Sequence, residues 1–441
     1  MDKKNPENIS VVEMLSYGGA QFALSIYTAF STYYLMMFCT DVALIPPAAT
    51  GALLLCYRLV SVADDPIMGL SINRVRFKEG KYRPYFKWLA LPFALGLAAF
   101  GLTPGIDPAA RVFLAAFTLI LCELSRSAMS TASLSMLPYF AKDDATRTKF
   151  VSFSNGSAIV SYIAIGTFML PLAGFLGRGD RSKGFTLTLI LFAAIALPLL
   201  LNAWFRLKER HYGETPGKPS LGDLVLAIVS NKRFLMFLIG FFLYAMANSF
   251  KNQIGYYYVT YNLENPDLLP IVNFAGLISS LAMQPVIPRL LAYAKKESLI
   301  IFGVFASSIA SLMMLAAGSN PVALIVCFVF YGLFTAIVAN LTFAVIASFT
   351  DEIRLRRNMN MSEILTASMG LSSNLGLTIT SVLAPLAMEM SGYSAEASSQ
   401  APAALAGFKI LFILCTALGL ALSGLVFSAT FRKRPRQETT A

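Results

Sequence analysis

An arginine and two aspartates interrupt a segment that is otherwise apolar. The segment contains Arg58, Asp64 and Asp65 within one predicted helix. Charged side chains at membrane depth cost free energy, and they are normally kept where they face a partner or a cavity. Hard cations take oxygen ligands, and Ser61 lies one helical turn before Asp65. We therefore predict a Na⁺ or H⁺ site at Asp65, with Asp64 and Ser61 beside it.

A simpler alternative is a helix-end aspartate that Arg74 or Arg76 neutralises from the following loop. Arg58 lies seven residues before Asp65, on about the same helix face. It is therefore predicted to pair with an acidic residue inside the protein.

Glu123 and Arg126 lie three residues apart in a second apolar segment. This spacing allows them to pair along one helix face, which gives an internally neutralised ion pair. The alternative places Arg126 at a substrate cavity, because Arg126 and Ser130 share a face. Ser127 lies beside them and is a further candidate.

Lys251 lies about halfway along its apolar segment, too far from either end to reach the surface easily. It either pairs with a carboxylate or binds an anionic substrate. Polar residues also recur on one face of the first apolar segment, as a lined cavity requires; they are Gln21, Ser25, Thr28 and Thr32. Ser and Thr also join helices to one another, so each residue alone is a weak signal.

The composition is that of a polytopic membrane protein. The chain has 441 residues, of which 56% are hydrophobic and 13% charged. Soluble domains carry about 25% charged residues. The net charge of +11 resides mostly in short loops, so no basic soluble domain is present to bind nucleic acid.

Several chemistries are excluded by what the sequence lacks. Its one histidine, His211, lies in a polar loop, and its five cysteines have no metal-ligand spacing. No nucleophile elbow or phosphate-binding loop is present, which argues against an enzyme and a cofactor. No repeated filter sequence indicates a channel.

We predict an all-α fold with twelve transmembrane helices. The apolar segments cover about residues 14–38, 47–71, 87–104, 111–138, 150–176, 184–205, 234–262, 268–293, 298–317, 320–349, 362–390 and 405–430. With cytoplasmic termini, 27 Lys and Arg residues fall on the inner face and 5 on the outer face. This asymmetry predicts that both termini are cytoplasmic in the cell membrane.

The longest polar interruption divides the chain into two six-helix halves. The predicted parts are residues 1–205, a linker at 206–233 with a short surface helix, residues 234–430, and a basic tail at 431–441. Two six-helix halves are typical of the major facilitator architecture. The aromatic run at 256–261 is predicted to lie at the membrane interface.

Several motifs resemble the glycoside–pentoside–hexuronide:cation symporters of the major facilitator superfamily, the melibiose-carrier-like proteins. The motifs are Ser16-Tyr-Gly, Thr40-Asp-Val, Asp64-Asp-Pro-Ile-Met-Gly and Gly80-Lys-Tyr-Arg-Pro-Tyr. The resemblance covers nearly the whole chain and is strongest over about residues 12–90. It implies a major facilitator fold and cation-coupled uptake of a small solute.

The resemblance also implies roles for single residues. Asp65 would be a cation-site acid that Ser127 joins, and Ser61 takes the place of a second acid. The places of the family's sugar-binding acids hold Ser25 and Ser130. Two basic sugar-site positions are replaced by Asn155 and Asn374, and the charges that would stabilise or gate the carrier are Asp41, Arg58, Glu123 and Asp351.

Sugar recognition through carboxylates is therefore not expected. Arg126 and Lys251 favour an anionic solute such as a uronide, because a buried cation is tolerable when the ligand supplies the counter-charge. A carrier of a lipid-like or other organic anion is the alternative. The expected partners are this solute, the coupling H⁺ or Na⁺, and membrane lipid around a monomer, with substrate and cation bound midway between the halves.

Overall fold

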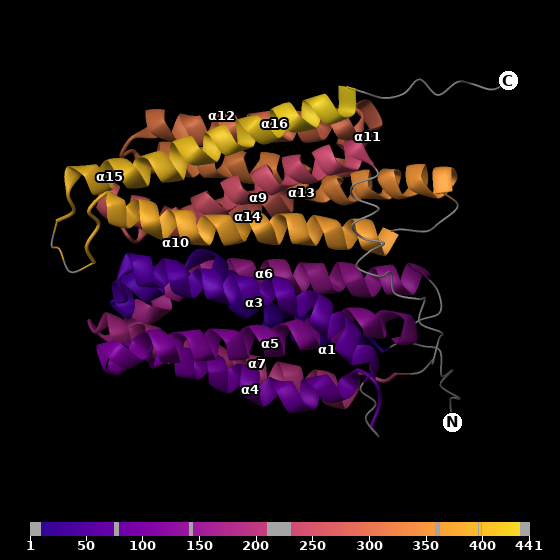
Figure 1. Cartoon of the computed structure of the whole chain (residues 1–441), viewed down its shortest axis with the longest axis horizontal. Coiled ribbons are helices and arrows are strands. Elements are labelled where there is room, and N and C mark those ends of the chain that lie inside the picture. The colour runs from indigo at the N-terminus through magenta and orange to yellow at the C-terminus, as the bar shows by residue number, and fades with distance from the viewer. Residues whose placement is uncertain are drawn as a thin grey trace. The chain divides into compact units, whose positions relative to one another are not determined.

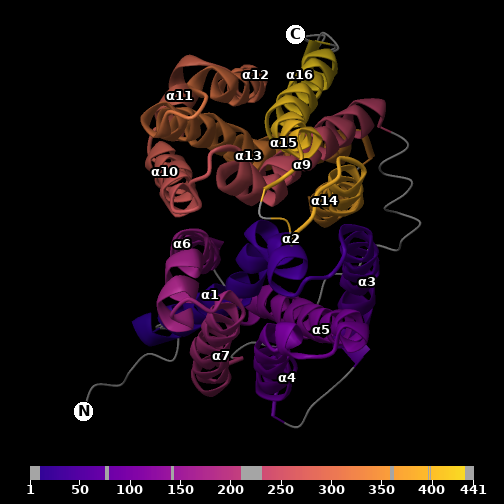
Figure 2. The ribbon, with the colours of Figure 1, turned by 90° about the vertical axis from the view of Figure 1, so that its left-hand side faces the viewer.

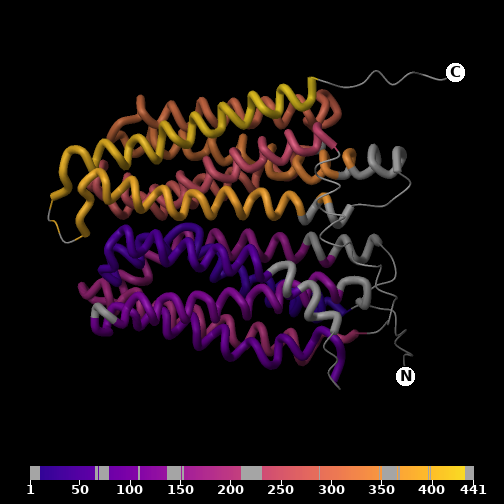
Figure 3. The backbone as a smooth tube through the Cα atoms, in the orientation of Figure 1, coloured from indigo at the N-terminus to yellow at the C-terminus, as the bar shows by residue number. Residues whose placement is uncertain are grey.

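The computed structural model describes residues 10–74, 79–140, 144–209, 231–357, 362–395, 397 and 399–432 (Figure 3). The predicted linker helix and most of the basic tail lie outside these residues. So do the side chains of Asp65 and Asp351, although their backbone belongs to described helices. Every regular element of the described chain is helical, which confirms the predicted all-α fold.

The chain divides into two compact units, and the described residues up to 209 belong to the first unit (Figures 1 and 2). The helices of this unit are α1 (Val11–Tyr33), α2 (Leu35–Met37), α3 (Pro47–Arg74), α4 (Arg83–Gly101), α5 (Pro108–Phe140), α6 (Asp144–Gly177) and α7 (Arg181–Arg206).

The second unit is also built from helices. Its helices are α9 (Lys232–Tyr257), α10 (Leu268–Met283), α11 (Ile287–Tyr293), α12 (Lys296–Ala317), α13 (Pro321–Arg357), α14 (Ser362–Met390), α15 (Pro402–Lys409) and α16 (Thr416–Arg432). Together the helices account for twelve segments at the predicted places. The eighth predicted segment is broken between α10 and α11, where Pro285 lies, because proline cannot continue the backbone hydrogen bonds of a helix.

Eight helices of the described chain are long and apolar enough to cross a membrane. A ninth candidate joins α1 to the segment Leu35–Val42 across a bend of 65°. The remaining predicted segments fall on α3, α4 and the pair α10 and α11, which carry charges or are short.

The helices pair in the same way within each unit. In the first unit α1 packs on α6 and α7, and α4 packs on α5 and α7. In the second unit α9 packs on α14 and α16, and α12 packs on α13 and α16. Small residues allow this close packing: a side chain added at Gly184 of α7 would overlap the Ala173 carbonyl of α6.

A repeated turn marks the corresponding ends of α1 and α9. In the first unit the π-helical turn Phe38–Val42 follows the short helix α2 just beyond α1, and in the second unit the π-helical turn Tyr258–Asn262 follows α9 directly. Each turn is followed by a residue with positive φ, Leu44 and Glu264, both at 53°. Because a non-glycine residue rarely adopts this conformation, its recurrence indicates that the two units are structural repeats.

The aromatic residues at the end of α9 do not form the predicted interfacial belt. Tyr256, Tyr257 and Tyr258 are all buried. Tyr257 stacks with Phe408, and Tyr258 stacks with Phe412 at a centroid distance of 4.7 Å. The prediction was wrong because an interfacial aromatic and a core aromatic have the same sequence signature.

Candidate functional site

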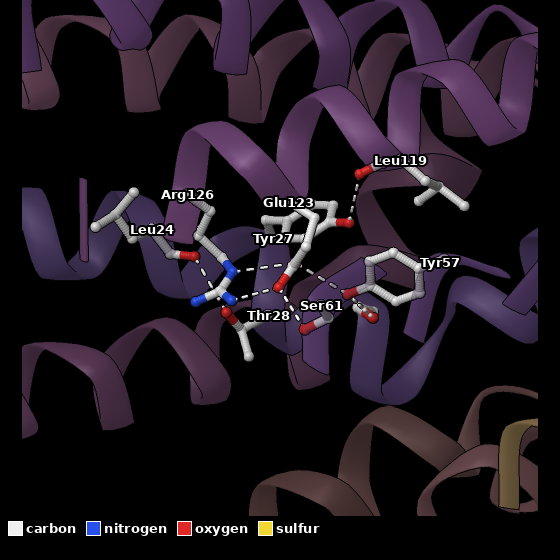
Figure 4. A network of polar contacts seen from close by, with 9 residues as sticks. Leu24, Tyr27, Thr28, Tyr57, Ser61, Leu119, Glu123 and Arg126 are labelled. Carbon is white, nitrogen blue, oxygen red and sulfur yellow. Dashed lines mark hydrogen bonds and ion pairs between the residues drawn. The ribbon is translucent and has the colours of Figure 1, made fainter. Parts of the chain in front are cut away.

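The first unit contains a buried polar cluster centred on the carboxylate of Glu123 (Figure 4). Glu123 is 2% exposed and accepts hydrogen bonds from two residues of α3. The Ser61 hydroxyl donates to Oε1 at 2.7 Å, and the Tyr57 hydroxyl donates to Oε2 at 3.2 Å. Tyr57 and Ser61 lie four residues apart and therefore share one face of α3.

Arg126 completes this cluster from the same helix as Glu123. Its Nη2 donates to Oε1 of Glu123 at 2.5 Å and its Nε donates to Oε2 at 3.2 Å. The predicted ion pair is thus present, with two parallel hydrogen bonds. Such bidentate contacts fix geometry as well as adding energy.

Helix α1 supplies the wall of the cluster. Tyr27 packs edge-on against Tyr57 at 6.4 Å and donates its hydroxyl to the Leu119 carbonyl at 3.2 Å. The hydroxyls of Ser31 and Tyr57 are 3.4 Å apart. Thr28 donates to the Leu24 carbonyl on the same helix (Figure 4). Three helices therefore surround one carboxylate.

Arg58 places a second guanidinium beside the cluster. Its Cζ lies 5.0 Å from the centre of the Tyr57 ring. Its Nε is buried and has no hydrogen-bond partner among the described residues. Two cations thus neighbour one carboxylate in this part of the unit.

The structure describes the side chains of some, but not all, of the other residues predicted for the cation site. Asp64 is 2% exposed and Ser127 is also 2% exposed, so both are buried in the unit. The side chain of Asp65 lies outside the described residues, so its role remains a prediction.

The predicted sugar-site positions are more dispersed. Gln21 donates to Ser25 at 3.4 Å along α1, and Ser25 is buried. Ser130 lies on α5 one turn beyond Arg126 and is partly exposed, whereas Asn155 on α6 is exposed. None of these four residues contacts the Glu123 carboxylate through a hydrogen bond that the structure shows.

In the second unit, Lys251 of α9 is buried between two aromatic rings of α13. Its Nζ lies 3.9 Å from the Phe328 ring centre and 4.3 Å from that of Tyr331. The residue is 8% exposed, and no carboxylate pairs with it among the described side chains. Tyr331 also donates its hydroxyl to Asn248 at 2.8 Å.

The first predicted alternative, a carboxylate partner, is not found among the described side chains, and binding of an anionic substrate stays a prediction. Attraction to aromatic faces compensates a desolvated ammonium only in part. Asn374, predicted for the same ligand, lies on α14 and is partly buried.

Two of the predicted gating charges lie near a described cation: Glu123 pairs with Arg126, and Asp41 lies near Arg181. The carboxylate of Asp41 is 2% exposed and lies 4.0 Å from Nη2 of Arg181 on α7. The side chain of Asp351 lies outside the described residues, so its gating role stays a prediction.

The loop before α4 is held by the end of α7. The Glu209 carboxylate accepts the backbone N–H groups of Lys81, Tyr82 and Arg83 at 2.8 to 2.9 Å. Arg83 donates to the Trp204 carbonyl at 2.8 Å and lies 4.9 Å from the Trp204 ring centre. The motif at residues 80–85 is therefore anchored within the first unit.

Sequence reasoning missed the aromatic partners of both clusters. Tyr57 is detectable because it precedes Ser61 by four residues, on the face that carries Ser61. Phe328 and Tyr331 are three residues apart in an apolar helix, a pattern shared with any packed core. Only the tertiary structure distinguishes them from other core aromatics.

The comparisons with known proteins agree with this architecture. A family model described as MFS/sugar transport protein matches residues 16–431. The uncharacterized symporter YnaJ of Bacillus subtilis is 26% identical over 95% of this chain and 92% of its own length. The isoprimeverose transporter of Lactiplantibacillus pentosus is 24% identical over 94% of this chain and 87% of its own length.

A more distant relative and a solved structure extend these matches. A putative 2,3-dihydroxypropane-1-sulfonate exporter of Escherichia coli is 24% identical, covering 77% of this chain and 75% of its own length. The crystal structure of the nucleoside transporter NupG covers 96% of this chain and 100% of its own, with a TM-score of 0.70 and 14% identity. At this identity the second match shows the fold alone. The chain therefore belongs to the MFS/sugar transport protein family, as a multi-pass membrane transporter of the glycoside–pentoside–hexuronide group in the major facilitator superfamily.

Proposed function

We propose that this protein is a secondary symporter that uses H⁺ or Na⁺ to import a small anionic solute of the glycoside type, by alternating access. The observation that carries the anionic solute is Lys251. This ammonium is buried between Phe328 and Tyr331 without a carboxylate partner among the described side chains. A buried cation is tolerable when a ligand supplies the opposite charge.

The names of two relatives give independent support for this class of solute. One of them is named as a transporter of the sugar isoprimeverose and another as a putative exporter of a sulfonate. A sugar-derived solute with an acidic group combines both features. The serines at positions 25 and 130 leave polar groups without negative charge, which would not repel an anion.

The coupling ion is proposed from the acidic residues of α3 and α5. Asp64 and Glu123 are both buried at 2% exposure, and Asp65 is the neighbouring predicted site. Carboxylate and hydroxyl oxygens suit either a proton or Na⁺. Apart from the coupling ion, no cofactor is required, and a monomer suffices for this mechanism.

The test is uptake into proteoliposomes from a pool of methyl glucoside, methyl glucuronide and a sulfonated methyl glycoside. Uptake is driven by an imposed H⁺ gradient or an imposed Na⁺ gradient, and wild type is compared with Asp65→Asn and Lys251→Ala. We expect gradient-driven accumulation of an acidic member, lost in Asp65→Asn and reduced at least about tenfold in Lys251→Ala.

Lys232→Ala is the matched control, because Lys232 lies on the same helix but is exposed. It should transport like wild type. Accumulation of only the neutral glycoside, or wild-type uptake by Lys251→Ala, would refute the anionic solute. No accumulation under either gradient would refute the proposed function as a whole.

A further inference from the structure

The ion pair in the first unit is asymmetric in its exposure. The Glu123 side chain is 2% exposed, whereas the Arg126 side chain is 21% exposed. The carboxylate is thus enclosed, and the guanidinium forms the accessible side of the pair. A ligand that reaches this cluster meets Arg126 first.

Arg126 also has donors to spare. A guanidinium carries five N–H groups, and two of them bind Glu123. The other three have no partner among the described residues. Together with the buried Nε of Arg58, which also has none, they make a place for an anion.

The charges lead to the same conclusion. Arg58 and Arg126 both neighbour the single carboxylate of Glu123. A second buried acid, Asp64, lies on the same helix as Arg58, six residues further on. An anion that binds the free N–H groups of Arg126 shares the single positive charge of this guanidinium with Glu123, so the attraction between Arg126 and Glu123 weakens.

We propose that Glu123 and Arg126 form an exchangeable ion pair that couples the two transported ligands. The anionic solute draws Arg126 away from Glu123, and the coupling cation takes the place of the guanidinium on the Glu123 carboxylate. This inference rests on the proposed symport function. It names a coupling residue additional to Asp65.

The exchange is obligatory because a buried carboxylate cannot remain without a counter-charge. Without the cation, removal of Arg126 would leave Glu123 enclosed with no described cation hydrogen-bonded to it, because Arg58 makes no ion pair with it, so the solute binds weakly. With the cation present, Glu123 is neutralised and Arg126 is released to the solute. One monoanion and one cation enter together, so the net charge of the cluster is unchanged.

The oxygens that would receive the cation are already assembled. Both Glu123 oxygens lie with the Ser61 and Tyr57 hydroxyls in one buried cluster. The titratable or charged groups around it come from four helices: Tyr27 on α1, Tyr57 and Arg58 on α3, Cys122 and Arg126 on α5, and Tyr162 on α6. Tyr162 lies within electrostatic range of both arginines. Among these side chains Glu123 supplies the one negative charge at neutral pH.

The test measures solute affinity as a function of cation concentration in purified protein. The probe is the acidic glycoside that wild type accumulates from the pool. By linkage, the cation should tighten solute binding to wild type by about tenfold or more. Glu123→Gln should bind the solute tightly at every cation concentration, with a change below about twofold, because the amide no longer retains Arg126 by charge.

Transport of the same variant separates coupling from solute binding. In proteoliposomes, Glu123→Gln should exchange internal for external solute but should not accumulate it against a gradient. A merely structural role would weaken solute binding instead and leave its cation dependence in place. That result would overturn the exchangeable pair while the proposed symport function stood.

Ser61→Ala provides a second variant if Glu123→Gln does not fold. Loss of the Ser61 donor favours protonation of the carboxylate, so a proton-coupled carrier would reach half-saturation at a proton concentration about three- to tenfold lower. Loss of the Ser61 oxygen weakens a Na⁺ ligand set, so a Na⁺-coupled carrier would need a higher concentration. An unchanged half-saturating concentration for both ions would contradict the inference.

Asp180→Asn is the matched control for the change from acid to amide. Asp180 caps α7 in a loop and bonds Lys183, far along the chain from the cluster. The solute affinity of Asp180→Asn should depend on cation concentration as that of wild type does. If wild type itself bound no acidic probe, the proposed function would fail together with the inference.

Discussion

At the scale of single residues, the two buried cations differ in how they are compensated. Arg126 has a bidentate carboxylate partner, whereas Lys251 has only two aromatic faces among the described residues. The cost of removing a charge from water must be repaid by partners or by a ligand. The two residues should therefore respond in opposite directions to the same apolar substitution.

Replacing Arg126 with methionine should destabilise the protein. The substitution leaves Glu123 buried without its counter-charge, which costs about 3 to 5 kcal/mol. The midpoint of thermal unfolding in detergent should fall by several degrees. The double variant with Glu123→Gln should recover most of this loss, and an unchanged midpoint in Arg126→Met alone would disprove the stabilising role.

Replacing Lys251 with methionine should have the opposite effect on stability. The change removes an ammonium that no described carboxylate balances and keeps a similar apolar volume. We expect the free energy of unfolding to rise by about 1 to 3 kcal/mol. Uptake of the acidic solute should be lost. The same thermal assay checks the change in stability, and a lower midpoint would indicate that Lys251 has a structural partner.

At the scale of elements, the contact between α4 and the end of α7 is the best-defined joint in the first unit. Glu209 accepts the backbone N–H groups of Tyr82 and Arg83, which the start of α4 leaves without helical partners, and that of Lys81 in the preceding loop. A negative charge at a helix N-terminus is favourable for the same reason. This explains how the residues at 80–85 are positioned.

Substituting Glu209 with alanine should therefore weaken this joint. Loss of an acceptor shared by three amides should cost about 1 to 3 kcal/mol. Glu79→Ala is the matched control, because Glu79 forms only an exposed pair with Lys87 and such pairs contribute about 0 to 1 kcal/mol. Faster hydrogen exchange of residues 81–83 in Glu209→Ala, but not in Glu79→Ala, is the expected measurement. Equal exchange in both variants would contradict the anchoring role.

At the scale of the whole molecule, the two units repeat one arrangement of six helical segments. The helix pairs recur, as do the π-helical turns and the positive φ angles of Leu44 and Glu264. The chemistry does not repeat. A carboxylate with two guanidiniums occupies the first unit, and a lysine between aromatic rings occupies the second. The units thus share a scaffold and differ in charge.

The membrane orientation remains a prediction that labelling can test. The native cysteines are first replaced, and single cysteines are introduced by Thr440→Cys in the tail or by Ser182→Cys in the first turn of α7. A membrane-impermeant thiol reagent applied to intact cells should label Ser182→Cys and not Thr440→Cys, because the Lys and Arg excess predicts cytoplasmic termini. The opposite labelling pattern would show that the orientation is inverted.

The sequence alone determined the membrane class and the twelve helical segments, and it gave the Glu123–Arg126 pair as one of two alternatives. The length of an apolar segment and the i, i+3 spacing of two residues are local properties, so both can be recognised without knowledge of the fold. The sequence also indicated Ser61 and Lys251 as functional candidates, because polar groups in apolar helices are few and conspicuous.

Only the tertiary structure decided which of these residues meet. Ser61 and Glu123 are 62 residues apart in sequence and 2.7 Å apart in space. The rings around Lys251 come from a helix about 80 residues later in the chain. Tyr256, Tyr257 and Tyr258, which follow Lys251 on the chain, are buried inside the protein rather than exposed at the membrane interface. Such contacts depend on which helices pack together and on their rotation, and a pattern of apolar residues around the helix does not specify either.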